Sequence, residues 1–342
     1  MSFKNKTISI IGLGRMGRRH IHAAQKLGMT LDKLYDPLDA AIESTKTEVD
    51  LPDSVFCRSM RDLYAGPRPD CVVIATTADS HCRLVCEAAE NGVKYILVEK
   101  PMATSLADCD LMIEVCKRYG AQLAVNHQMR FMDQYIEPKQ LLNSAAFGGM
   151  TSMTVVGGNF GMAMNALHYF ESFRFMTDEA PVEVSAWFSS EKVPNPRGPQ
   201  FEDKGGAIRI STASGKRFYL DVGTDQGHGV QVIYGARNGL IAVDELMGKV
   251  RAVCRQEEYA ELPTTRYGMP ATEREFQIKA AEVIDSTAAV LHALLSGQNS
   301  VDPQQGRQAI AVLAAGYLSA ENGGVPIRLS QELSRDRSFP WA

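Results

Sequence analysis

Short apolar runs alternate with amphipathic stretches over the first 125 residues of the chain. Runs typical of buried strands occupy residues 7–11, 31–35, 71–75, 95–98 and 123–125, and a weaker run occupies 55–57. Between these runs, apolar positions spaced three and four residues apart predict helices over residues 15–27, 37–48, 79–89 and 105–119. Continuous apolar strands that alternate with amphipathic helices are typical of a parallel sheet covered on both faces.

The pattern changes after the sequence Phe147-Gly148-Gly149. Strand-like segments now follow one another, at 150–156, 182–188, 207–211, 217–222, 230–234 and 240–243, and helical patterns occupy 162–176, 272–295 and 303–320. Successive strands favour an antiparallel or mixed sheet. The predicted fold class is therefore α/β, with a doubly wound parallel sheet in residues 1–125 and an α+β domain with a large, mostly antiparallel sheet in residues 126–342. The final segment either stays with the second domain or packs back on the first.

Size and composition agree with two ordinary globular domains. The 342 residues exceed what one hydrophobic core usually organises. With 45% hydrophobic and 22% charged residues, the composition is that of a globular protein. Lys and Arg total 36 against 40 Asp and Glu, a net charge of −4, so no nucleic-acid partner is expected.

Neither a membrane nor a metal is expected as a partner. No apolar run approaches the ~20 residues that a membrane span needs. The run at 7–11 is too short for the core of a signal peptide, so we expect a cytoplasmic location. The seven cysteines are odd in number and form no Cys-x-x-Cys pair, and the histidines show no cluster at ligand spacing. The sequence therefore predicts reduced cysteines and no metal site.

A glycine-rich turn joins the first predicted strand to the first helix and fits Gly-x-Gly-x-x-Gly, the pattern of dinucleotide-binding Rossmann domains. Its residues are Gly12, Leu13, Gly14, Arg15, Met16 and Gly17. Gly12 permits the tight turn, Gly14 lets the backbone approach a pyrophosphate, and Gly17 allows the helix to pack closely on the strand. The helix N-terminus adds unpaired N–H groups that attract phosphate. A tight turn without a ligand is the alternative.

Asp36 ends the second predicted strand. A carboxylate there accepts hydrogen bonds from the adenosine ribose hydroxyls and repels a 2′-phosphate, which favours NAD over NADP. No arginine follows Asp36 within several residues, and the alternative is a carboxylate that caps the next helix. In the first helix, Arg15, Arg18 and Arg19 either lie near the predicted phosphate site or form a solvated face.

Three further motifs point to one family. They are Ala75-Thr76-Thr77-Ala78-Asp79-Ser80-His81, Val98-Glu99-Lys100-Pro101 and Asn126-His127-Gln128-Met129-Arg130-Phe131. Together they resemble the Gfo/Idh/MocA family of glucose–fructose oxidoreductases and inositol dehydrogenases. The resemblance covers nearly the whole chain, and Glu-Lys-Pro is its most specific element. The family combines a Rossmann domain with a substrate domain built on a sheet, which agrees with the pattern above.

The resemblance assigns cofactor contacts to residues that follow the Rossmann strands. It implies that Thr76 and Thr77 line the cofactor near the nicotinamide-side ribose, that His81 belongs to the same loop, and that Glu99 contacts the nicotinamide side. It implies that Lys100 reaches cofactor and substrate, takes part in catalysis and precedes a cis proline peptide. A helix-starting histidine without a ligand is the alternative for His81, and a surface lysine is the alternative for Lys100.

The second catalytic candidate lies in the first helix of the second domain. His168 matches the histidine of a family motif that typically reads Asp-x-Gly-x-His-x-x-Asp, and Glu171 matches its final acidic residue. The first Asp is absent, because Met164 stands four residues before His168, and Ala166 replaces the glycine. A carboxylate one turn earlier would raise the histidine pKa and orient the ring. Either Asn165 orients the ring, the proton relay differs, or catalysis is impaired; a purely structural histidine is the further alternative.

Polar residues follow the last Rossmann strand, where the two domains are expected to join. Asn126, Gln128 and Arg130 suit recognition of a hydroxyl-rich ligand, and Arg130 can pair with a carboxylate or phosphate through two hydrogen bonds. A structural polar network is the alternative. With Asn165 and His168, these three residues make up the predicted substrate site.

These observations predict an NAD-dependent oxidoreductase that acts on a secondary hydroxyl or keto group of a sugar, sugar derivative or polyol. Lys100 would polarise the reacting oxygen, His168 would exchange its proton, and Asn165 would position one or both. The substrate class and a homodimer or homotetramer rest on the resemblance alone. Two alternatives stay open: a catalytically weak dinucleotide-binding sensor or partner protein, and an enzyme that recycles its NAD during an epimerisation or elimination.

Overall fold

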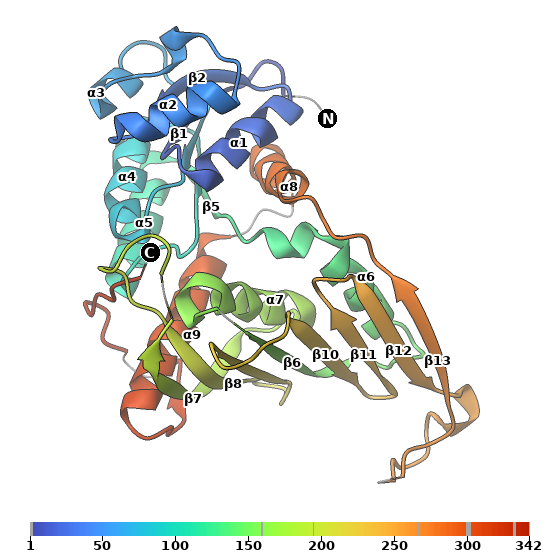
Figure 1. Cartoon of the computed structure of the whole chain (residues 1–342). Helices are drawn as coiled ribbons and strands as arrows, with labels where there is room; N and C mark the ends of the chain where they lie inside the picture. Colours follow the sequence, from blue (N-terminus) through green and yellow to red (C-terminus); the bar gives the residue numbers. More distant parts are fainter. Residues whose placement is uncertain are drawn as a thin grey trace. The chain divides into compact units, whose positions relative to one another are not determined.

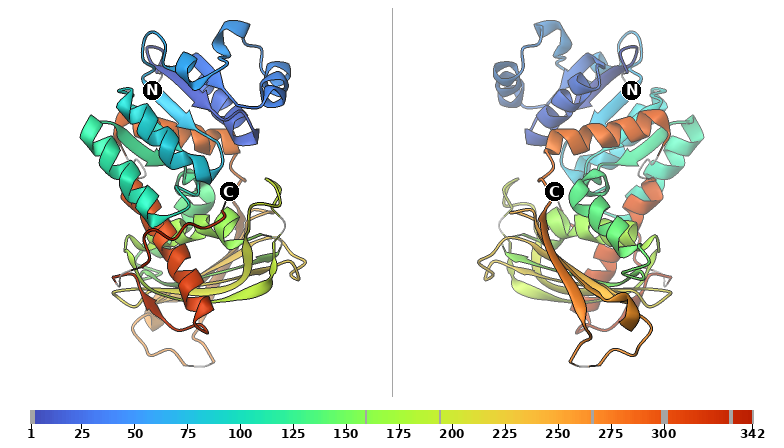
Figure 2. Two further views of the ribbon diagram at one scale, coloured as in Figure 1. Left: turned by 90° about the vertical axis from the view of Figure 1, so that its left-hand side faces the viewer. Right: turned by 90° about the vertical axis from the view of Figure 1, so that its right-hand side faces the viewer.

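The computed structural model describes residues 3–158, 160–193, 195–265, 267–298, 302–330 and 333–341 (Figures 1 and 2). The chain forms two compact units, each of which is discontinuous in sequence. Unit 1 comprises Met1–Gln128, Glu282–Ile310 and Ser334–Ala342, and unit 2 comprises Met129–Ala281 and Ala311–Leu333. The sequence prediction placed residues 126–342 in the second domain and left open a return of the final segment to the first domain. The chain enters unit 1 again at Glu282–Ile310 and at Ser334–Ala342.

Unit 1 is built on a five-stranded parallel sheet in the order β2-β1-β3-β4-β5. The strands are β1 (Thr7–Ile11), β2 (Thr30–Tyr35), β3 (Cys71–Ile74), β4 (Tyr95–Val98) and β5 (Gln122–Val125). Every residue of β3 and β4 is buried, as expected for strands covered on both faces. The predicted parallel Rossmann sheet is confirmed. Its strand order reverses between β1 and β3, and ligands of open α/β sheets bind at such a point.

Helices cover both faces of this sheet (Figure 1). One face carries α1 (Arg15–Lys26) and α8 (Val283–Ser296), and the other carries α4 (Ala78–Glu90) and α5 (Leu106–Tyr119). The connection after β2 contains α2 (Asp39–Glu48), η1 (Asp53–Val55) and α3 (Met60–Leu63).

The strand predicted over residues 55–57 is wrong. Pro52 leads into the 3-10 turn η1, and only Phe56 makes an isolated bridge, to Leu34 of β2. The apolar run is too short to pair further, since its first residue already belongs to the turn.

The last described residues of the chain pack onto unit 1. The Phe339 N–H donates to the Thr104 carbonyl oxygen at 2.9 Å. Arg335 pairs with Asp110 of α5 at 2.7 Å. Trp341 is 1% exposed, and its ring stacks on Phe339 with centroids 4.4 Å apart. This segment therefore anchors the stretch between β4 and α5, which follows the Glu-Lys-Pro motif.

Unit 2 is built on a nine-stranded sheet in the order β13-β12-β11-β10-β6-β9-β8-β7-β14. The strands are β6 (Met150–Gly158), β7 (Pro181–Lys192), β8 (Lys204–Thr212), β9 (Arg217–Gly223), β10 (Gln231–Ala236), β11 (Gly239–Asp244), β12 (Lys249–Arg255), β13 (Ala271–Gln277) and β14 (Ile327–Arg328). All neighbours are antiparallel except β6 and β9. The predicted large, mostly antiparallel sheet is confirmed.

One face of the large sheet is buried under helices of unit 2 (Figure 1). Phe170 and Phe173 of α7 (Leu167–Thr177) pack on Phe218 of β9, with ring centroids 6.0 and 5.4 Å apart. Also in unit 2 are α6 (Asp133–Leu142), beside α7, and the later turns of α9 (Pro303–Glu321). Within the described ranges, no helix has the length and apolar character of a membrane span.

The helix predicted over residues 272–295 is confirmed only in its second half. Residues 271–277 form β13, and α8 begins only at Val283. Charged residues on alternate positions of β13 pair across to β12, where Arg251 binds Glu273 at 2.7 Å. These cross-strand pairs outweigh the helical propensity of the segment.

Candidate active site

The glycine-rich turn has the geometry that close approach of a pyrophosphate requires. Gly12 has φ +93°, and a Cβ there would lie 2.7 Å from the Ala75 backbone. A Cβ on Gly17 would lie 1.9 Å from the Gly12 carbonyl oxygen, so α1 approaches β1 closely. A Cβ on Gly14, the N-cap of α1, would meet no atom within 4 Å, and Met16 is half-buried. The space beside Gly14 at the start of α1 is thus open, and the N–H groups of a first helical turn attract phosphate.

Asp36 lies directly beside this turn. Its Oδ2 accepts from the N–H of Leu13 at 2.7 Å, and its Oδ1 accepts from the N–H of Leu38 at 2.9 Å. Leu38, not Asp36, is the N-cap residue of α2. Asp36 lines a cavity of about 630 Å³ together with the exposed Arg58. In the sequence, α2 and η1 separate Arg58 from Asp36, so Arg58 is not among the residues that directly follow Asp36.

The three arginines of α1 differ in their contacts. Arg18 pairs with Glu48 at 2.6 Å and donates to the carbonyl oxygen of the fully buried Leu13 at 3.0 Å, so it has a structural role. Burial and the positive charge of Arg15 lower the pKa of Arg19. Arg15 and Arg19 are like charges one helical turn apart, and an anion at this end of α1 would relieve their repulsion.

The loop after β3 is braced by His81. Thr76 and Thr77 are half-buried at the end of β3, and the hydroxyl oxygens of Thr76 and Ser80 lie 2.6 Å apart. His81 is fully buried: its Nδ1 lies 2.9 Å from the Pro101 carbonyl oxygen and its Nε2 lies 3.2 Å from that of Thr76. Burial lowers the pKa of His81. The ring therefore ties the loop after β3 to the loop after β4.

Glu99 forms a buried polar cluster with His20 and Asn126. Its Oε1 lies 2.8 Å from His20 Nε2 and accepts from Asn126 Nδ2 at 2.7 Å, while Oε2 accepts from the Lys100 N–H at 3.3 Å. Burial alone would raise the pKa of Glu99, but the hydrogen bond and charge of His20, with smaller effects of Lys100 and Asn126, hold the pKa at about 2. Glu99 is therefore an ionised, buried carboxylate at the end of β4.

Lys100 and Gln128 complete the predicted residues of unit 1. Lys100 is half-buried and precedes a cis peptide bond to Pro101, as the resemblance implied. The Gln128 side-chain oxygen accepts from the Thr287 hydroxyl of α8 at 2.8 Å. Gln128 is thus half-buried and tied to the fold of unit 1, which matches its structural alternative.

Arg130 contacts two residues of unit 2. Its guanidinium pairs with Glu171, and the two side chains are 11% and 0% exposed. The guanidinium also lies over the Phe175 ring, 5.4 Å from the centroid. Burial raises the pKa of Glu171, although Arg130 opposes that effect. These contacts match the structural alternative for Arg130. They also show that Glu171, the final acidic residue of the family motif, pairs with an arginine.

Asn165 and His168 are both half-buried where the π-helical turn η3 (Met162–Ala166) continues into α7. Met164 would lie one turn before His168, on the same face, only if the whole segment were α-helical. A π-turn bonds residues five apart and rotates the side chains that precede it relative to those of the α-helix. The four-residue spacing between Met164 and His168 therefore does not establish that the two side chains lie on the same face.

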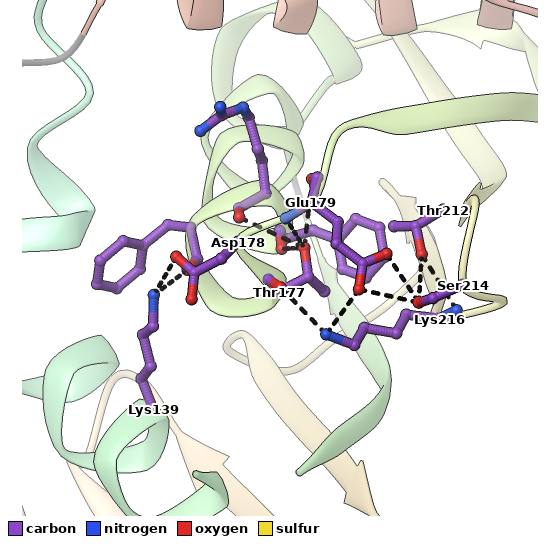
Figure 3. Close-up of polar contacts among 10 residues, drawn as sticks. Lys139, Thr177, Asp178, Glu179, Thr212, Ser214 and Lys216 are labelled. Carbon is purple, nitrogen blue, oxygen red and sulfur yellow. Dashed lines mark hydrogen bonds and ion pairs between the residues drawn. The ribbon is translucent and has the colours of Figure 1, made fainter.

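Two lysines hold the C-terminal end of α7 (Figure 3). Lys216 donates to the Thr177 carbonyl oxygen at 3.1 Å and pairs with Glu179 at 3.0 Å. Lys139 pairs with Asp178 at 2.7 Å. Positive charge at a helix C-terminus is favourable because it opposes the negative end of the helix dipole. The far end of the helix that carries the predicted base is thus held in place.

The fold and these motifs have counterparts in known proteins. Residues 6–127 match the model of an oxidoreductase family with an NAD-binding Rossmann fold, Gfo/Idh/MocA. Residues 6–127 thus form the NAD-binding Rossmann domain of this family. The chain is 27% identical over 209 residues to inositol 2-dehydrogenase from Gluconacetobacter diazotrophicus, covering 56% of this chain and 61% of that protein. It is 35% identical over 142 residues to a 2,7-anhydro-N-acetylneuraminate hydratase from Mediterraneibacter gnavus, covering 41% of this chain and 36% of that protein.

The chain thus matches less than two thirds of the length of either relative. A solved oxidoreductase from Agrobacterium radiobacter, in complex with NAD+, L-tartaric acid and magnesium, has a TM-score of 0.77 to this structure. That match covers 95% of this chain and 98% of that chain at 19% identity, so it concerns the fold.

The residues of this Rossmann domain fit a dinucleotide. The space before the N–H groups of α1, next to Gly14, suits a pyrophosphate, and the cavity beside Asp36 suits an adenosine. Thr76, Glu99 and Lys100 follow β3 and β4, on the same edge of the sheet. Among the described residues, no three His, Cys, Asp or Glu side chains cluster as a metal site.

Two residues of this edge escaped the sequence analysis. His20 is fully buried on α1 and faces a carboxylate 79 residues later in the chain. Arg58 follows a run that was predicted as a strand. Neither belongs to a recognisable local motif. The one available signal was the position of His20 on the inward face of the first helix, which the sequence analysis did not use.

Proposed function

We propose that this protein is an NAD-dependent oxidoreductase that acts on a secondary hydroxyl or keto group of a sugar, sugar derivative or polyol. The observation that carries the proposal is the set of residues on one edge of the parallel sheet: an open glycine-rich turn, Asp36 beside it, and Lys100 after β4. The name of the Gluconacetobacter relative supports a polyol as substrate.

Each proposed catalytic residue has one task. When bound, NAD supplies the nicotinamide that accepts the hydride from the carbinol carbon. The Lys100 ammonium stabilises the negative charge that develops on the substrate oxygen. His168, in its neutral form, takes the hydroxyl proton on a ring nitrogen, and Asn165 orients the ring or a substrate hydroxyl. In the reverse reduction, His168 returns that proton.

The residues around these groups have supporting tasks. Glu99 stays ionised at neutral pH and keeps a negative charge next to the Lys100 backbone, which favours the charged ammonium. Asn126 is buried and donates to Glu99 Oε1 at 2.7 Å, so its proposed task is to hold that carboxylate in place. We propose NAD rather than NADP because the Asp36 carboxylate would repel a 2′-phosphate; Arg58, in the same cavity, would contact the adenosine.

The test follows absorbance at 340 nm with NAD+ and a panel of polyols, free sugars, sugar acids and nucleotide sugars. We expect NADH formation with the wild type, and a rate lower by about 100-fold or more in Lys100→Ala. The NADH dissociation constant of the variant, from fluorescence titration, should stay near the wild-type value. Near-normal turnover in Lys100→Ala would contradict the assignment of Lys100.

A second candidate is a reaction that recycles its NAD. The similarity to a hydratase favours it, since adding water to a substrate involves no net oxidation. Enzyme-bound NADH would then appear transiently after mixing with substrate, while no net NADH accumulates. Stopped-flow absorbance with a stoichiometric amount of NAD+ separates this candidate from a dehydrogenase.

We also propose that the protein forms a homodimer or homotetramer through the open face of the large sheet. Trp187, Tyr219 and Ile233 point away from the buried face and are 55%, 39% and 37% exposed. Exposed aromatic and aliphatic side chains on one face of a sheet, here on β7, β9 and β10, are typical of protein–protein interfaces. Light scattering of Trp187→Asp should show a shift toward the monomer, and an unchanged mass would contradict the proposed face.

A further inference from the structure

A buried carboxylate stands at the start of the helix that carries the predicted base. Asp203, in the loop before β8, is 1% exposed. Its Oδ1 accepts from the Ala163 N–H at 2.9 Å, and its Oδ2 accepts from the Met164 N–H at 2.8 Å. Both donors belong to the π-turn that precedes His168. One side chain therefore binds two of the N–H groups that a helix leaves unpaired at its N-terminus.

The local sequence offers this helix no cap of its own. Gly161 occupies the N-cap position and has no side chain that could cap the turn, and the first turn contains no acidic residue. The cap comes instead from Asp203, which is 42 residues later in the chain. Its negative charge meets the positive end of the helix dipole, which stabilises both the helix and the ionised carboxylate.

Gly161 is what permits this arrangement. A Cβ on residue 161 would lie 2.2 Å from Cγ of Asp203. The backbone at Gly161 has φ −107°, a value that any residue can adopt, so the close carboxylate is the reason for a glycine here. Asp203 is fixed in turn: its Oδ1 accepts from the Lys204 N–H at 2.9 Å, and its carbonyl oxygen accepts from the Val193 N–H at 3.1 Å.

We propose that Asp203 is a positioning residue for the reaction. It holds the π-turn in the conformation that presents Asn165 and His168 to the substrate. It also places a carboxylate next to the backbone of residue 164, where the family motif has an Asp and this chain has Met164. The inference rests on the proposed function, and it concerns the backbone of this turn rather than a contact with substrate.

Three substitutions and one control test the proposal. Asp203→Ala removes both acceptors, Asp203→Asn keeps one oxygen, and Gly161→Ala displaces the carboxylate without removing it. We expect kcat to fall by about 100-fold in Asp203→Ala and Gly161→Ala, because small misplacements of catalytic groups have effects of that order, and by less in Asp203→Asn. Glu179→Gln is the matched control, since it removes a carboxylate at the other end of the same helix, and its kcat should stay within about twofold of wild type.

The readouts separate positioning from general damage. NADH binding depends on unit 1, so the NADH dissociation constant should not change in any of the variants. A kcat that is unaltered in Asp203→Ala would overturn the proposal. A loss of kcat that is matched by an equal loss of NADH binding would also overturn it, because it indicates unfolding of the whole chain.

Hydrogen exchange tests the same inference without turnover. Exchange of the amides at residues 163–168 should be at least about tenfold faster in Asp203→Ala than in wild type, and unchanged in Glu179→Gln. If the wild type turns over no substrate at all, the proposed function fails while this measurement still decides the role of Asp203. Unchanged exchange at these amides would overturn the inference.

Discussion

Replacing Glu99 by glutamine tests whether the buried cluster of Glu99, His20 and Asn126 is held together by charge. The pKa of Glu99 is about 2 in the folded protein, against its usual 4.5. A carboxyl group whose pKa is lower in the folded than in the unfolded state stabilises the fold. The contribution is complete at pH values above the pKa of the unfolded state, and it disappears as the pH falls to the pKa of the folded state. At about 1.36 kcal/mol per pKa unit, the contribution is about 3 kcal/mol at pH 7.

The Glu99→Gln variant keeps the size of the side chain and loses its charge. We expect the loss of the charge alone to lower the free energy of unfolding by about 3 kcal/mol at pH 7, and by less than half of that at pH 3. The glutamine amide would also face the Lys100 N–H, donor against donor. That mismatch adds a cost of about 1 kcal/mol that does not depend on pH.

The two tryptophans of the chain allow unit 1 to be followed alone. Trp341 is buried in unit 1, and Trp187 is exposed in unit 2. In a Trp187→Phe background, tryptophan fluorescence during urea unfolding reports unit 1, which avoids treating two units as one transition. A difference between variant and wild type that is the same at pH 7 and pH 3 would refute the electrostatic origin of the cluster's stability.

Other substitutions probe the remaining features of the site. Asp36→Ala should narrow the preference for NADH over NADPH in fluorescence titrations, and an unchanged ratio would count against Asp36 as the ribose ligand. Gly17→Ala places a Cβ 1.9 Å from a backbone oxygen and should lower the melting temperature, whereas Gly14→Ala should fold normally and weaken only NADH binding. Arg130→Met leaves Glu171 buried without its partner and should lower the free energy of unfolding by about 3–5 kcal/mol in urea titrations. An Arg130→Met/Glu171→Leu double variant should recover most of that loss, and no recovery would show that the guanidinium matters for packing instead.

The parallel sheet of unit 1 could be predicted because its signals are local. The glycine-rich turn lies between a strand and a helix, and each of its glycines has the steric role that the motif implies. Ser105 caps α5 by accepting from the Asp108 N–H, and Gly120 ends the same helix with a left-handed conformation. A strand, a cap and a turn are each set by residues close together in the chain, so the sequence alone identifies them.

The contacts that could not be predicted join residues far apart in the chain. The bond between His20 and Glu99, the cavity shared by Asp36 and Arg58, and the cap of Asp203 on Met164 all depend on the tertiary fold. The strand β13 was mistaken for a helix for the same reason, since its alternating charges become a signal only when β12 lies beside them. The π-turn before His168 has no established sequence signature, so the spacing argument started from the wrong helix geometry.

The discontinuous course of unit 1 has a consequence for the order in which the protein is made. The five strands of its sheet leave the ribosome first. The helix α8 follows only after the first part of unit 2, Met129–Ala281, and the segment that ends in Trp341 follows after the whole of unit 2. Until then, the apolar surface that Leu291 and Leu294 of α8 would bury stays uncovered, and such surface promotes aggregation. A fragment that ends at residue 128 would keep the phosphate-binding turn but not the cover of its own sheet, so the nucleotide-binding unit cannot be separated from the rest of the protein by a single cut.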